Sequence, residues 1–294
     1  MRVFVTGATG FIGMPTVKEL IAAGHQVLGL ARSDEGAQSL KQIGADIHRG
    51  SLEDLDSLRQ GAVAADAVIH LAFIHDFSKF AENCAIDQRA IEALGSALEG
   101  SNKPLIVTSG TGLLTVPGKI ATEEDNPPAN SPMPRVSEQT ALSFVPKGVR
   151  ASVMRLPQVH DTLKQGLVTY AIAIAREKGL AAYVDDGLNR WPAAHVSDVA
   201  RLYRLALEKN EAGAKYHAVD EEGVPMKAIA ETIAKGLKVP VKSISADEAQ
   251  SHFGWLSLFV AYDLPASSAI TRKKLNWNPS GPGMITDLEN MNYA

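Results

Sequence analysis

Short runs of apolar residues alternate with longer amphipathic segments through the first half of the chain. The apolar runs predict buried strands at residues 3–5, 27–31, 46–48, 67–71 and 105–108. Between them, apolar positions recur with the period of a helix, which predicts helices at residues 11–23, 33–43 and 80–99. Strands of this length that alternate with helices are typical of βαβ units, whose right-handed crossovers cover both faces of a parallel sheet. The pattern therefore predicts an α/β fold with a doubly wound parallel Rossmann sheet.

The alternation stops after residue 108. Residues 115–134 contain five prolines among small and acidic residues, which predicts a long loop over the sheet. The remaining pattern predicts a strand at residues 151–155 and helices at residues 137–145, 167–178, 196–209 and 226–237. We expect a Rossmann domain over residues 1–155, whose core also includes residues 193–210, and a smaller C-terminal lobe over residues 156–294.

A glycine-rich segment, Thr6-Gly7-Ala8-Thr9-Gly10-Phe11-Ile12-Gly13, joins the first predicted strand to the first predicted helix. In a dinucleotide-binding loop, Gly7 would permit the tight turn, Gly10 would let the backbone approach a pyrophosphate, and Gly13 would let helix and strand pack closely. The N–H groups and the positive dipole end of the helix would then face the phosphates. The strand before and the helix after make this motif far more specific than its glycines alone. We predict that the nicotinamide cofactor contacts Gly7, Thr9, Gly10, Phe11, Ile12 and Gly13.

The end of the second predicted strand indicates which cofactor is bound. A site for NAD places a carboxylate there to hold the ribose 2′-hydroxyl, whereas a site for NADP places a cation there for the 2′-phosphate. That position falls on Arg32, which Ser33 follows. A guanidinium and a hydroxyl suit a phosphate monoester, so the sequence predicts NADP(H). Asp34 and Glu35 are expected to cap the following helix.

The balance of charged residues indicates which kind of molecule the protein binds. The net charge is −4, from 29 basic and 33 acidic side chains without a basic block, which argues against nucleic acid and favours a small-molecule substrate. Cys84 is the single cysteine, so no internal disulfide can form and no structural zinc or other metal site is expected. There is neither a signal-peptide pattern nor an apolar run of the ~20 residues that span a bilayer. We predict a cytoplasmic protein without membrane contact.

Several motifs in the same order resemble the extended or atypical short-chain dehydrogenases/reductases, the epimerase/dehydratase-like group. The resemblance covers nearly the whole chain and rests on the glycine loop together with five further segments: Gly50-Ser51-Leu52, residues 66–72, Arg155-Leu156-Pro157, residues 195–200 and residues 275–279. It implies that Ser51 and Leu52 touch adenine, although Ser51 replaces the family's usual acid. It also implies cofactor contacts at Leu71, Ala72, Phe73 and Pro157.

The catalytic centre departs from this family's pattern. The family uses a tyrosine with a lysine four residues later, which lowers the tyrosine pKa so that it can pass a proton to or from the substrate. None of the six tyrosines has a lysine at that spacing. If Glu138 matches the family's downstream glutamate, the two positions hold Asn130 and Pro134. The dyad is missing.

Other residues could supply the chemistry. Ser109 and Thr111 follow the fifth predicted strand and could hydrogen-bond a substrate carbonyl, or they could merely satisfy loop backbone groups. His75 and His160 are candidate proton donors, with surface or structural roles as the alternative. His70 and His195 are expected to be structural. Residues that could line a substrate pocket, or belong to the core, are Tyr170, Trp191 and residues 253–255.

The leading interpretation is an NADP(H)-dependent reductase that acts on a carbonyl or related unsaturated group, with the C-terminal lobe binding the substrate. Two alternatives remain open: a non-catalytic NADP(H)-binding redox sensor, which the missing dyad favours, and a nucleotide-sugar epimerase or dehydratase, which Arg32 disfavours. A homodimer formed through the helices near residues 80–99 and 137–145 is a further expectation.

Overall fold

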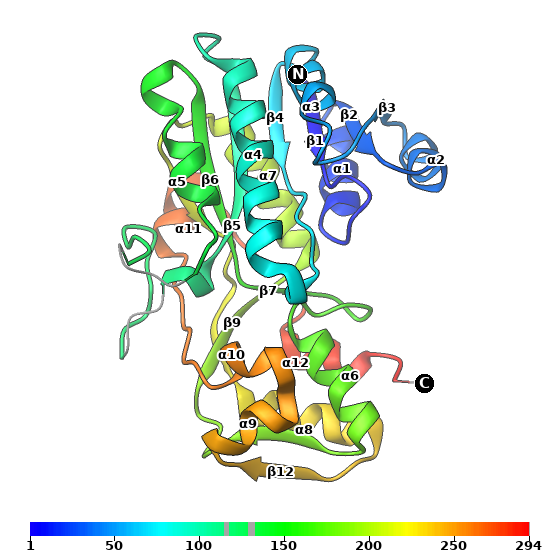
Figure 1. Cartoon of the computed structure of the whole chain (residues 1–294), viewed down its shortest axis with the longest axis vertical. Helices are drawn as coiled ribbons and strands as arrows, with labels where there is room; N and C mark the ends of the chain where they lie inside the picture. The colour runs from blue at the N-terminus through cyan, green and yellow to red at the C-terminus, as the bar shows by residue number, and fades with distance from the viewer. Residues whose placement is uncertain (115–117, 129–132, 294) are drawn as a thin grey trace.

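The computed structural model describes residues 1–114, 118–128 and 133–293. Two lobes are stacked along the long axis, as Figure 1 shows, with the parallel sheet and its helices in one and a smaller set of helices and strands in the other. The chain passes between the lobes more than once, because β10 and α11 return to the first lobe after the second has begun. Asn130, one of the two positions expected for the missing dyad, lies outside the described residues.

Seven strands form the central sheet in the order β10-β6-β5-β4-β1-β2-β3, and every neighbouring pair is parallel. This arrangement confirms the predicted doubly wound Rossmann sheet. The strand order reverses between β1 and β4, and ligands of such sheets bind outside the carboxyl ends at that reversal. The strands are β1 Arg2–Thr6, β2 Gln26–Ala31, β3 Asp46–Arg49, β4 Ala67–His70, β5 Pro104–Gly110, β6 Arg150–Leu156 and β10 Lys215–His217.

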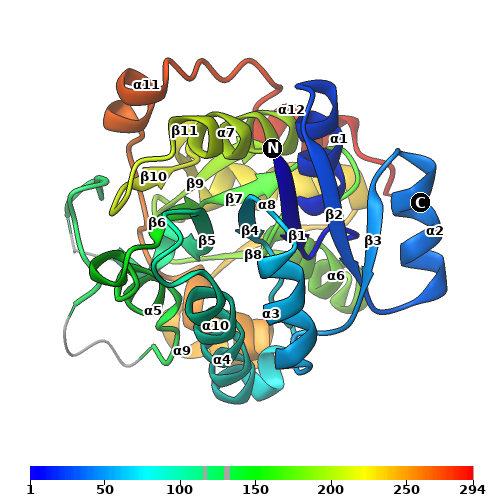
Figure 2. The same ribbon diagram turned by 90° about the horizontal axis from the view of Figure 1, so that it is seen from above.

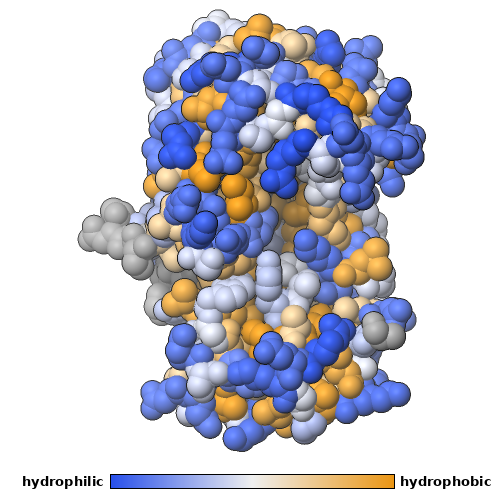
Figure 3. All heavy atoms as spheres, turned by 45° about the vertical axis from the view of Figure 1, so that its right-hand side comes forward, coloured by the Kyte–Doolittle hydropathy of each residue, from blue (hydrophilic) through white to orange (hydrophobic). Residues whose placement is uncertain are grey.

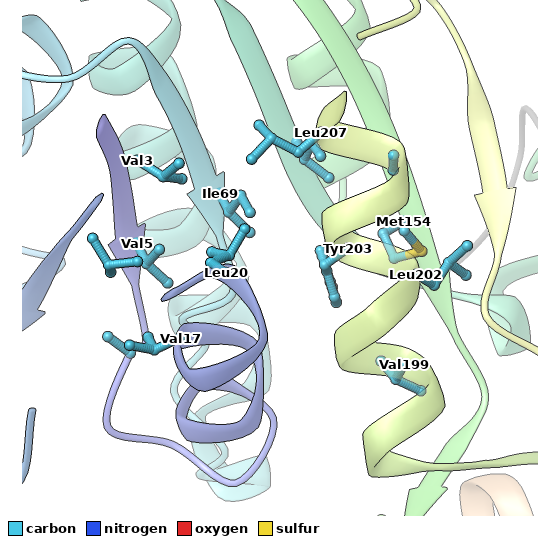
Figure 4. Close-up of a cluster of buried hydrophobic side chains, with 14 of the residues drawn as sticks. Val3, Val5, Val17, Leu20, Ile69, Met154, Val199, Leu202, Tyr203 and Leu207 are labelled. Atoms are coloured by element: carbon cyan, nitrogen blue, oxygen red, sulfur yellow. The ribbon is translucent and has the colours of Figure 1, made fainter. Parts of the chain in front are cut away.

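Helices cover both faces of this sheet, which Figure 2 shows from above. One face carries α1 (Gly13–Ala22), α2 (Asp34–Gln42) and α7 (Val196–Lys209), and the other carries α3 (Leu55–Val63), α4 (Phe80–Leu98) and α5 (Ser137–Leu142). Figure 4 shows how α1 and α7 fill the first face, with Leu20 beside Ile69 of β4 and Leu202 beside Met154 of β6. The Tyr203 hydroxyl of α7 also hydrogen-bonds the Thr108 hydroxyl of β5 at 2.7 Å. The packing of α1 and α7 and this hydrogen bond therefore hold the carboxyl ends of the central strands in place.

Two short sheets and several helices build the second lobe around its own apolar cluster. One sheet has the order β11-β9-β7 and the other pairs β12 with β8. The strands are β7 Gln158–His160, β8 Ala181–Val184, β9 Arg190–His195, β11 Glu221–Pro225 and β12 Val241–Ile244. The remaining α-helices are α6 Val168–Lys178, α8 Met226–Leu237, α9 Ala246–Phe253, α10 Ser257–Val260, α11 Ala269–Leu275 and α12 Met284–Asn290, of which α11 packs on α7 and β10. Short 3-10 turns lie at Phe77–Lys79, Thr111–Leu114, Val145–Lys147 and Gly254–Leu256.

Among the helices that differ from the sequence pattern, two do so for clear local physical reasons. The first helix begins at Gly13 rather than at Phe11, because the N–H of Gly10 folds back onto the Gly7 carbonyl at 2.9 Å and keeps the loop in a turn. Helix α3 had no counterpart in the pattern because its buried positions are mostly small residues. Gly61 is one of them, and a side chain there would collide with the ring of Phe4.

Candidate cofactor site and active site

The glycine loop is packed so tightly that two of its glycines cannot carry a side chain. Gly7 has a φ of +67°, and a Cβ there would lie 2.7 Å from the backbone nitrogen of Ala72. A Cβ on Gly13 would collide with the Gly7 carbonyl oxygen. Helix α1 has no side-chain N-cap, so its first N–H groups stand at the strand-order reversal without a side-chain acceptor. This geometry fits a diphosphate on the helix amino end.

Buried hydrogen bonds tie the end of β1 to the end of β4 directly beneath this loop. His70 of β4 bonds the Thr6 hydroxyl of β1 through Nδ1 at 2.8 Å and the Asp87 carboxylate through Nε2 at 3.0 Å. The Thr6 hydroxyl also accepts the N–H of Ala72 at 3.3 Å. Burial by itself raises the pKa of Asp87, but the hydrogen bond and charge of His70, with further contributions from Arg135 and Ser137, bring it below its usual range. His70 therefore has the structural role expected of it.

The adenosine end of the site lies at the carboxyl end of β2. Arg32 is exposed there, and no residue in the described part of the chain forms a hydrogen bond or ion pair with its side chain. The Ser33 hydroxyl caps α2 by accepting the N–H of Gly36 at 3.1 Å. Asp34 and Glu35 lie in the first turn of α2 but do not provide its side-chain cap, contrary to expectation.

The expected adenine contacts lie just beyond β3. The Ser51 hydroxyl accepts the N–H of Glu53 at 3.3 Å, and the partly buried Leu52 packs against the core on the α3 side of the sheet. These two residues lie one strand away from Arg32, on the same carboxyl edge. The edge therefore presents the residues predicted to contact adenine beside those predicted to contact the ribose.

Ser109 lies at the carboxyl end of β5 and is only 2% exposed. Its hydroxyl is buried and forms no hydrogen bond with any described residue. Buried hydroxyls are nearly always hydrogen-bonded, so this one is suited to a ligand oxygen or a water. Thr111 differs, because its hydroxyl already donates to the Leu156 carbonyl at 3.3 Å, near the half-buried Pro157.

Arg135, which the sequence patterns did not single out, is held beside this strand end. Its guanidinium carbon lies 4.4 Å from the centroid of the Phe73 ring, and its side chain donates to the Ser137 hydroxyl at 3.0 Å and to the Thr108 carbonyl at 3.1 Å. Ser137 in turn donates to Asp87 at 2.5 Å. A fixed, half-buried positive charge therefore lies one residue beyond Pro134, the expected position of the missing lysine. No periodicity marks such a residue, since it follows an irregular loop.

His75 lies among aromatic rings beyond the end of β4. Its ring centroid is 5.3 Å from that of Phe73 and 6.2 Å from that of Phe77. Desolvation lowers the pKa of His75, and the positive charges of Arg135 and Lys164 lower it further. Its imidazole is therefore neutral near pH 7 and can donate one hydrogen bond and accept another.

Lys164 is a second cation that the sequence patterns did not single out. Its ammonium lies 5.9 Å from the centroid of the Phe11 ring in the glycine loop. Together with its influence on His75, this places a positive charge between the glycine loop and the segment after β4. The signal that could have found it is its positive charge two residues before the glycine at residue 166.

His160 has its polar partners in the second lobe. It is fully buried, and its Nδ1 hydrogen-bonds the Asp287 carboxylate of α12 at 2.7 Å. Burial lowers the pKa of His160, although Asp287 and Glu221 oppose the shift. No hydrogen bond joins His160 to Ser109 among the residues that the structure describes; instead its bond to Asp287 ties β7 to α12. His195 bonds Ser197 at the start of α7, as a structural residue would.

The aromatic residues expected near the substrate divide into two sets. Trp191 is fully buried and Phe253 nearly so, and both belong to the core of the second lobe. Tyr170 and Trp255 instead meet a ring from the first lobe, Phe77, whose centroid lies 4.3 Å from Trp255 in a stacked arrangement. Figure 3 shows the surface hollowed between the lobes, with apolar side chains inside the hollow.

The described residues contain no group of three metal-ligating side chains, and no helix among them is both long and apolar enough to cross a bilayer. The fold and the glycine loop together define a Rossmann fold of the short-chain dehydrogenase/reductase type, whose loop geometry suits a dinucleotide. The chain belongs to the NAD dependent epimerase/dehydratase family, whose model matches residues 3–220.

Individual relatives agree with this membership. An uncharacterized protein of Schizosaccharomyces pombe is 48% identical over 295 residues, with 100% of both chains covered. The 4-hydroxy-2-methyl-3-oxo-4-farnesyl-3,4-dihydroquinoline-1-oxide ketoreductase of Stigmatella aurantiaca is 26% identical over 282 residues, covering 90% of this chain and 84% of that protein. Among solved structures, a dTDP-glucose 4,6-dehydratase of Streptomyces venezuelae with NAD bound has a TM-score of 0.78 at 18% identity, covering 99% of this chain and 96% of that one.

Proposed function

We propose that this protein is an NADP(H)-dependent oxidoreductase that reduces a carbonyl or related unsaturated group of a small molecule. The observation that carries the cofactor choice is Arg32, an exposed guanidinium at the end of β2 where an NAD site would have a carboxylate. Ser33 beside it adds a hydroxyl. The ketoreductase among the relatives supports a carbonyl as the reacting group.

The residues present fit the cofactor along its length. The glycine loop would hold the diphosphate, Arg32 and Ser33 the 2′-phosphate, and Ser51 with Leu52 the adenine. The nicotinamide would lie beyond the end of β4, near Leu71, Ala72, Phe73 and Pro157. When bound, NADPH supplies a hydride to the substrate.

The protein's own contribution is to polarise and orient the substrate. The Ser109 hydroxyl, which is buried without a partner among the described residues, would donate to the carbonyl oxygen, with Thr111 nearby. Arg135 would stabilise the negative charge that develops on this oxygen. A water that exchanges with solvent and hydrogen-bonds the neutral His75 imidazole would supply the proton to this oxygen, and direct proton transfer by His75 or His160 stays a prediction.

The same geometry supports separate parts of the chain for binding the cofactor and the substrate. Residues 1–155, together with 193–210, would bind the cofactor, and the rest of residues 156–294 would bind the substrate. Tyr170, Trp255 and Phe77 would form an apolar wall between them. A homodimer through α4 and α5 and a cytoplasmic location also stay predictions, the first of which light scattering on the purified protein would test.

The test is spectrophotometric. The protein is titrated with NADPH and with NADH by following cofactor fluorescence, and NADPH oxidation is then followed with a panel of ketones, aldehydes and enones. Binding of NADPH in preference to NADH, with turnover of at least one panel member, is the expected result. Absence of affinity for either cofactor would end the proposal.

A second candidate function rests on the missing tyrosine–lysine pair. A protein that binds NADPH without turning over any substrate could report the redox state of the cofactor pool, and it would not need a proton donor. Tight NADPH binding without oxidation across the whole panel favours this redox sensor. NAD released from the denatured protein would instead favour a nucleotide-sugar epimerase or dehydratase.

A further inference from the structure

A second arginine lies at the adenosine end of the site. Strands β2 and β3 are neighbours, and their register pairs Ala31 with Arg49. Arg49 therefore ends β3 beside the point where the chain leaves β2 at Arg32. Its side chain is 51% exposed and forms an ion pair with Asp34 in the first turn of α2.

The same corner adjoins the glycine loop. A Cβ added to Gly36 in α2 would lie 3.0 Å from the side chain of Thr9 and 3.3 Å from the Ser33 hydroxyl. The amino end of α2 is thus in contact with the loop predicted to hold the diphosphate. Arg32 directly follows β2, and Arg49 is the last residue of β3. Both therefore lie on the carboxyl edge of the sheet, next to this contact.

We propose that Arg49 is a second cation for the 2′-phosphate of NADP(H), and that Asp34 is a built-in competitor that holds Arg49 when no phosphate is bound. This inference rests on the proposed cofactor preference. The 2′-phosphate carries close to two negative charges and three acceptor oxygens, whereas the Asp34 carboxylate carries one charge. A phosphate would therefore displace the carboxylate from the guanidinium.

The ion pair between Arg49 and Asp34 is exposed to solvent, so replacing Asp34 by a phosphate requires little free energy. The Asp34 side chain is fully exposed, and ion pairs in water contribute little to stability, so breaking this one hardly affects the fold. Asp34 would then lie near the phosphate with its charge no longer neutralised. Its repulsion lowers the affinity for NADPH without acting on NADH, which has a hydroxyl at that position.

The proposal predicts opposite effects from the two halves of one ion pair. Arg49→Ala removes a phosphate ligand, so NADPH affinity should fall about tenfold while NADH affinity stays the same. Asp34→Asn removes the competitor and the repulsion, so NADPH affinity should rise about threefold. A purely structural ion pair would make both substitutions act in the same direction.

The experiment is a fluorescence titration with NADPH and with NADH of the parent, Arg32→Ala, Arg49→Ala and Asp34→Asn. Arg59→Ala is the matched control, because Arg59 forms a similarly exposed ion pair with Asp56 on α3, away from the site. Calorimetry with 2′,5′-ADP, compared with 5′-AMP, isolates the adenosine end. Circular dichroism confirms that each variant is folded.

The outcomes separate this inference from the function on which it rests. Opposite shifts in NADPH affinity for Arg49→Ala and Asp34→Asn, with none for Arg59→Ala, support it. An unchanged NADPH-to-NADH ratio in Arg49→Ala overturns it, even if Arg32→Ala lowers that ratio and thus upholds the cofactor preference. Loss of NADH binding in Asp34→Asn would assign Asp34 to the ribose hydroxyls and overturn it as well. If the parent protein shows no preference for NADPH over NADH, both the proposed cofactor preference and the proposed role of Arg49 and Asp34 are overturned.

Discussion

The guanidinium of Arg135 lies over the face of Phe73, 4.4 Å from the ring centroid, three residues beyond the end of β4. The ring and the hydrogen bonds to Ser137 and the Thr108 carbonyl hold the charge in place. A cation that is already oriented needs no reorganisation to stabilise a developing oxyanion. Arg135 thus offers a fixed positive charge in a site that lacks the expected lysine.

Replacing Arg135 with alanine should lower kcat/KM for the fastest carbonyl of the panel by about 10²-fold, since a lost oxyanion partner typically has this effect. Arg135→Lys should recover part of the loss, because the charge returns without the planar stack. NADPH affinity should change little, since the residues predicted to bind the phosphates are untouched. Steady-state kinetics and cofactor titration measure the two quantities.

The control for this prediction is Arg176→Ala, which removes an arginine on α6 whose described contact is a weak one, 3.4 Å to the Tyr293 carbonyl. Its kinetics should match those of the parent. If Arg135→Ala retained the parent's kcat/KM, Arg135 would have no role in the reaction and Ser109 would have to polarise the substrate alone.

Patterns along the chain could predict the Rossmann sheet and the turn geometry of the glycine loop because these signals are local. Gly7 and Gly13 are required by close backbone approaches within one turn, so the motif and its surroundings suffice. The hydrogen-bond network beneath the loop and beside the end of β5 is assembled from distant segments instead. Asp87 meets His70 across 17 residues and Ser137 across 50, and no periodicity encodes such contacts.

Gly7→Ala should destabilise the fold and abolish cofactor binding. Alanine at a φ of +67° is strained by about 1–2 kcal/mol, and its Cβ would also clash with the backbone of Ala72. Gly24→Ala is the matched control, because Gly24 also has a positive φ, +86°, but nothing within 4 Å of its added Cβ. Urea unfolding and NADPH titration should show a small stability loss and normal binding for Gly24→Ala. Equal behaviour of the two variants would contradict the close approach.

Cys84 should be unreactive in the native protein. It is buried in α4, and burial raises the pKa of its thiol to about 11, so the reactive thiolate is scarce. A disulfide reagent at about pH 8 should label the native protein slowly and the protein in concentrated guanidinium chloride at once. Cys84→Ala should show no labelling in either state. Rapid stoichiometric labelling of the native parent would contradict the burial of this thiol.

His217 should make the fold less stable as the solution becomes acidic. Its Nδ1 donates to the Ser267 carbonyl at 2.7 Å, and its Nε2 lies 3.1 Å from the Arg155 guanidinium, which leaves no acceptor for a second proton. Burial lowers the pKa of His217 to about 4, and Arg155 acts in the same direction, whereas Glu123 opposes it. The unfolded chain, with a histidine pKa of about 6.5, therefore binds more protons than the folded chain between these two values.

The stability that neutral His217 provides is complete above about pH 6.5 and is lost as the pH falls toward about 4, at about 1.4 kcal/mol per pH unit. His217→Gln keeps an acceptor for Arg155 but cannot titrate, so its unfolding free energy should fall less steeply over this range. Ser268→Ala, a substitution at a neighbouring buried hydroxyl that donates to the Val219 carbonyl at 2.5 Å, should lower stability at every pH and keep the parent's slope. Urea unfolding at a series of pH values measures these slopes. Parallel curves for the parent and His217→Gln would mean that His217 takes up a proton in the folded state as readily as in the unfolded one, which its contact with Arg155 argues against.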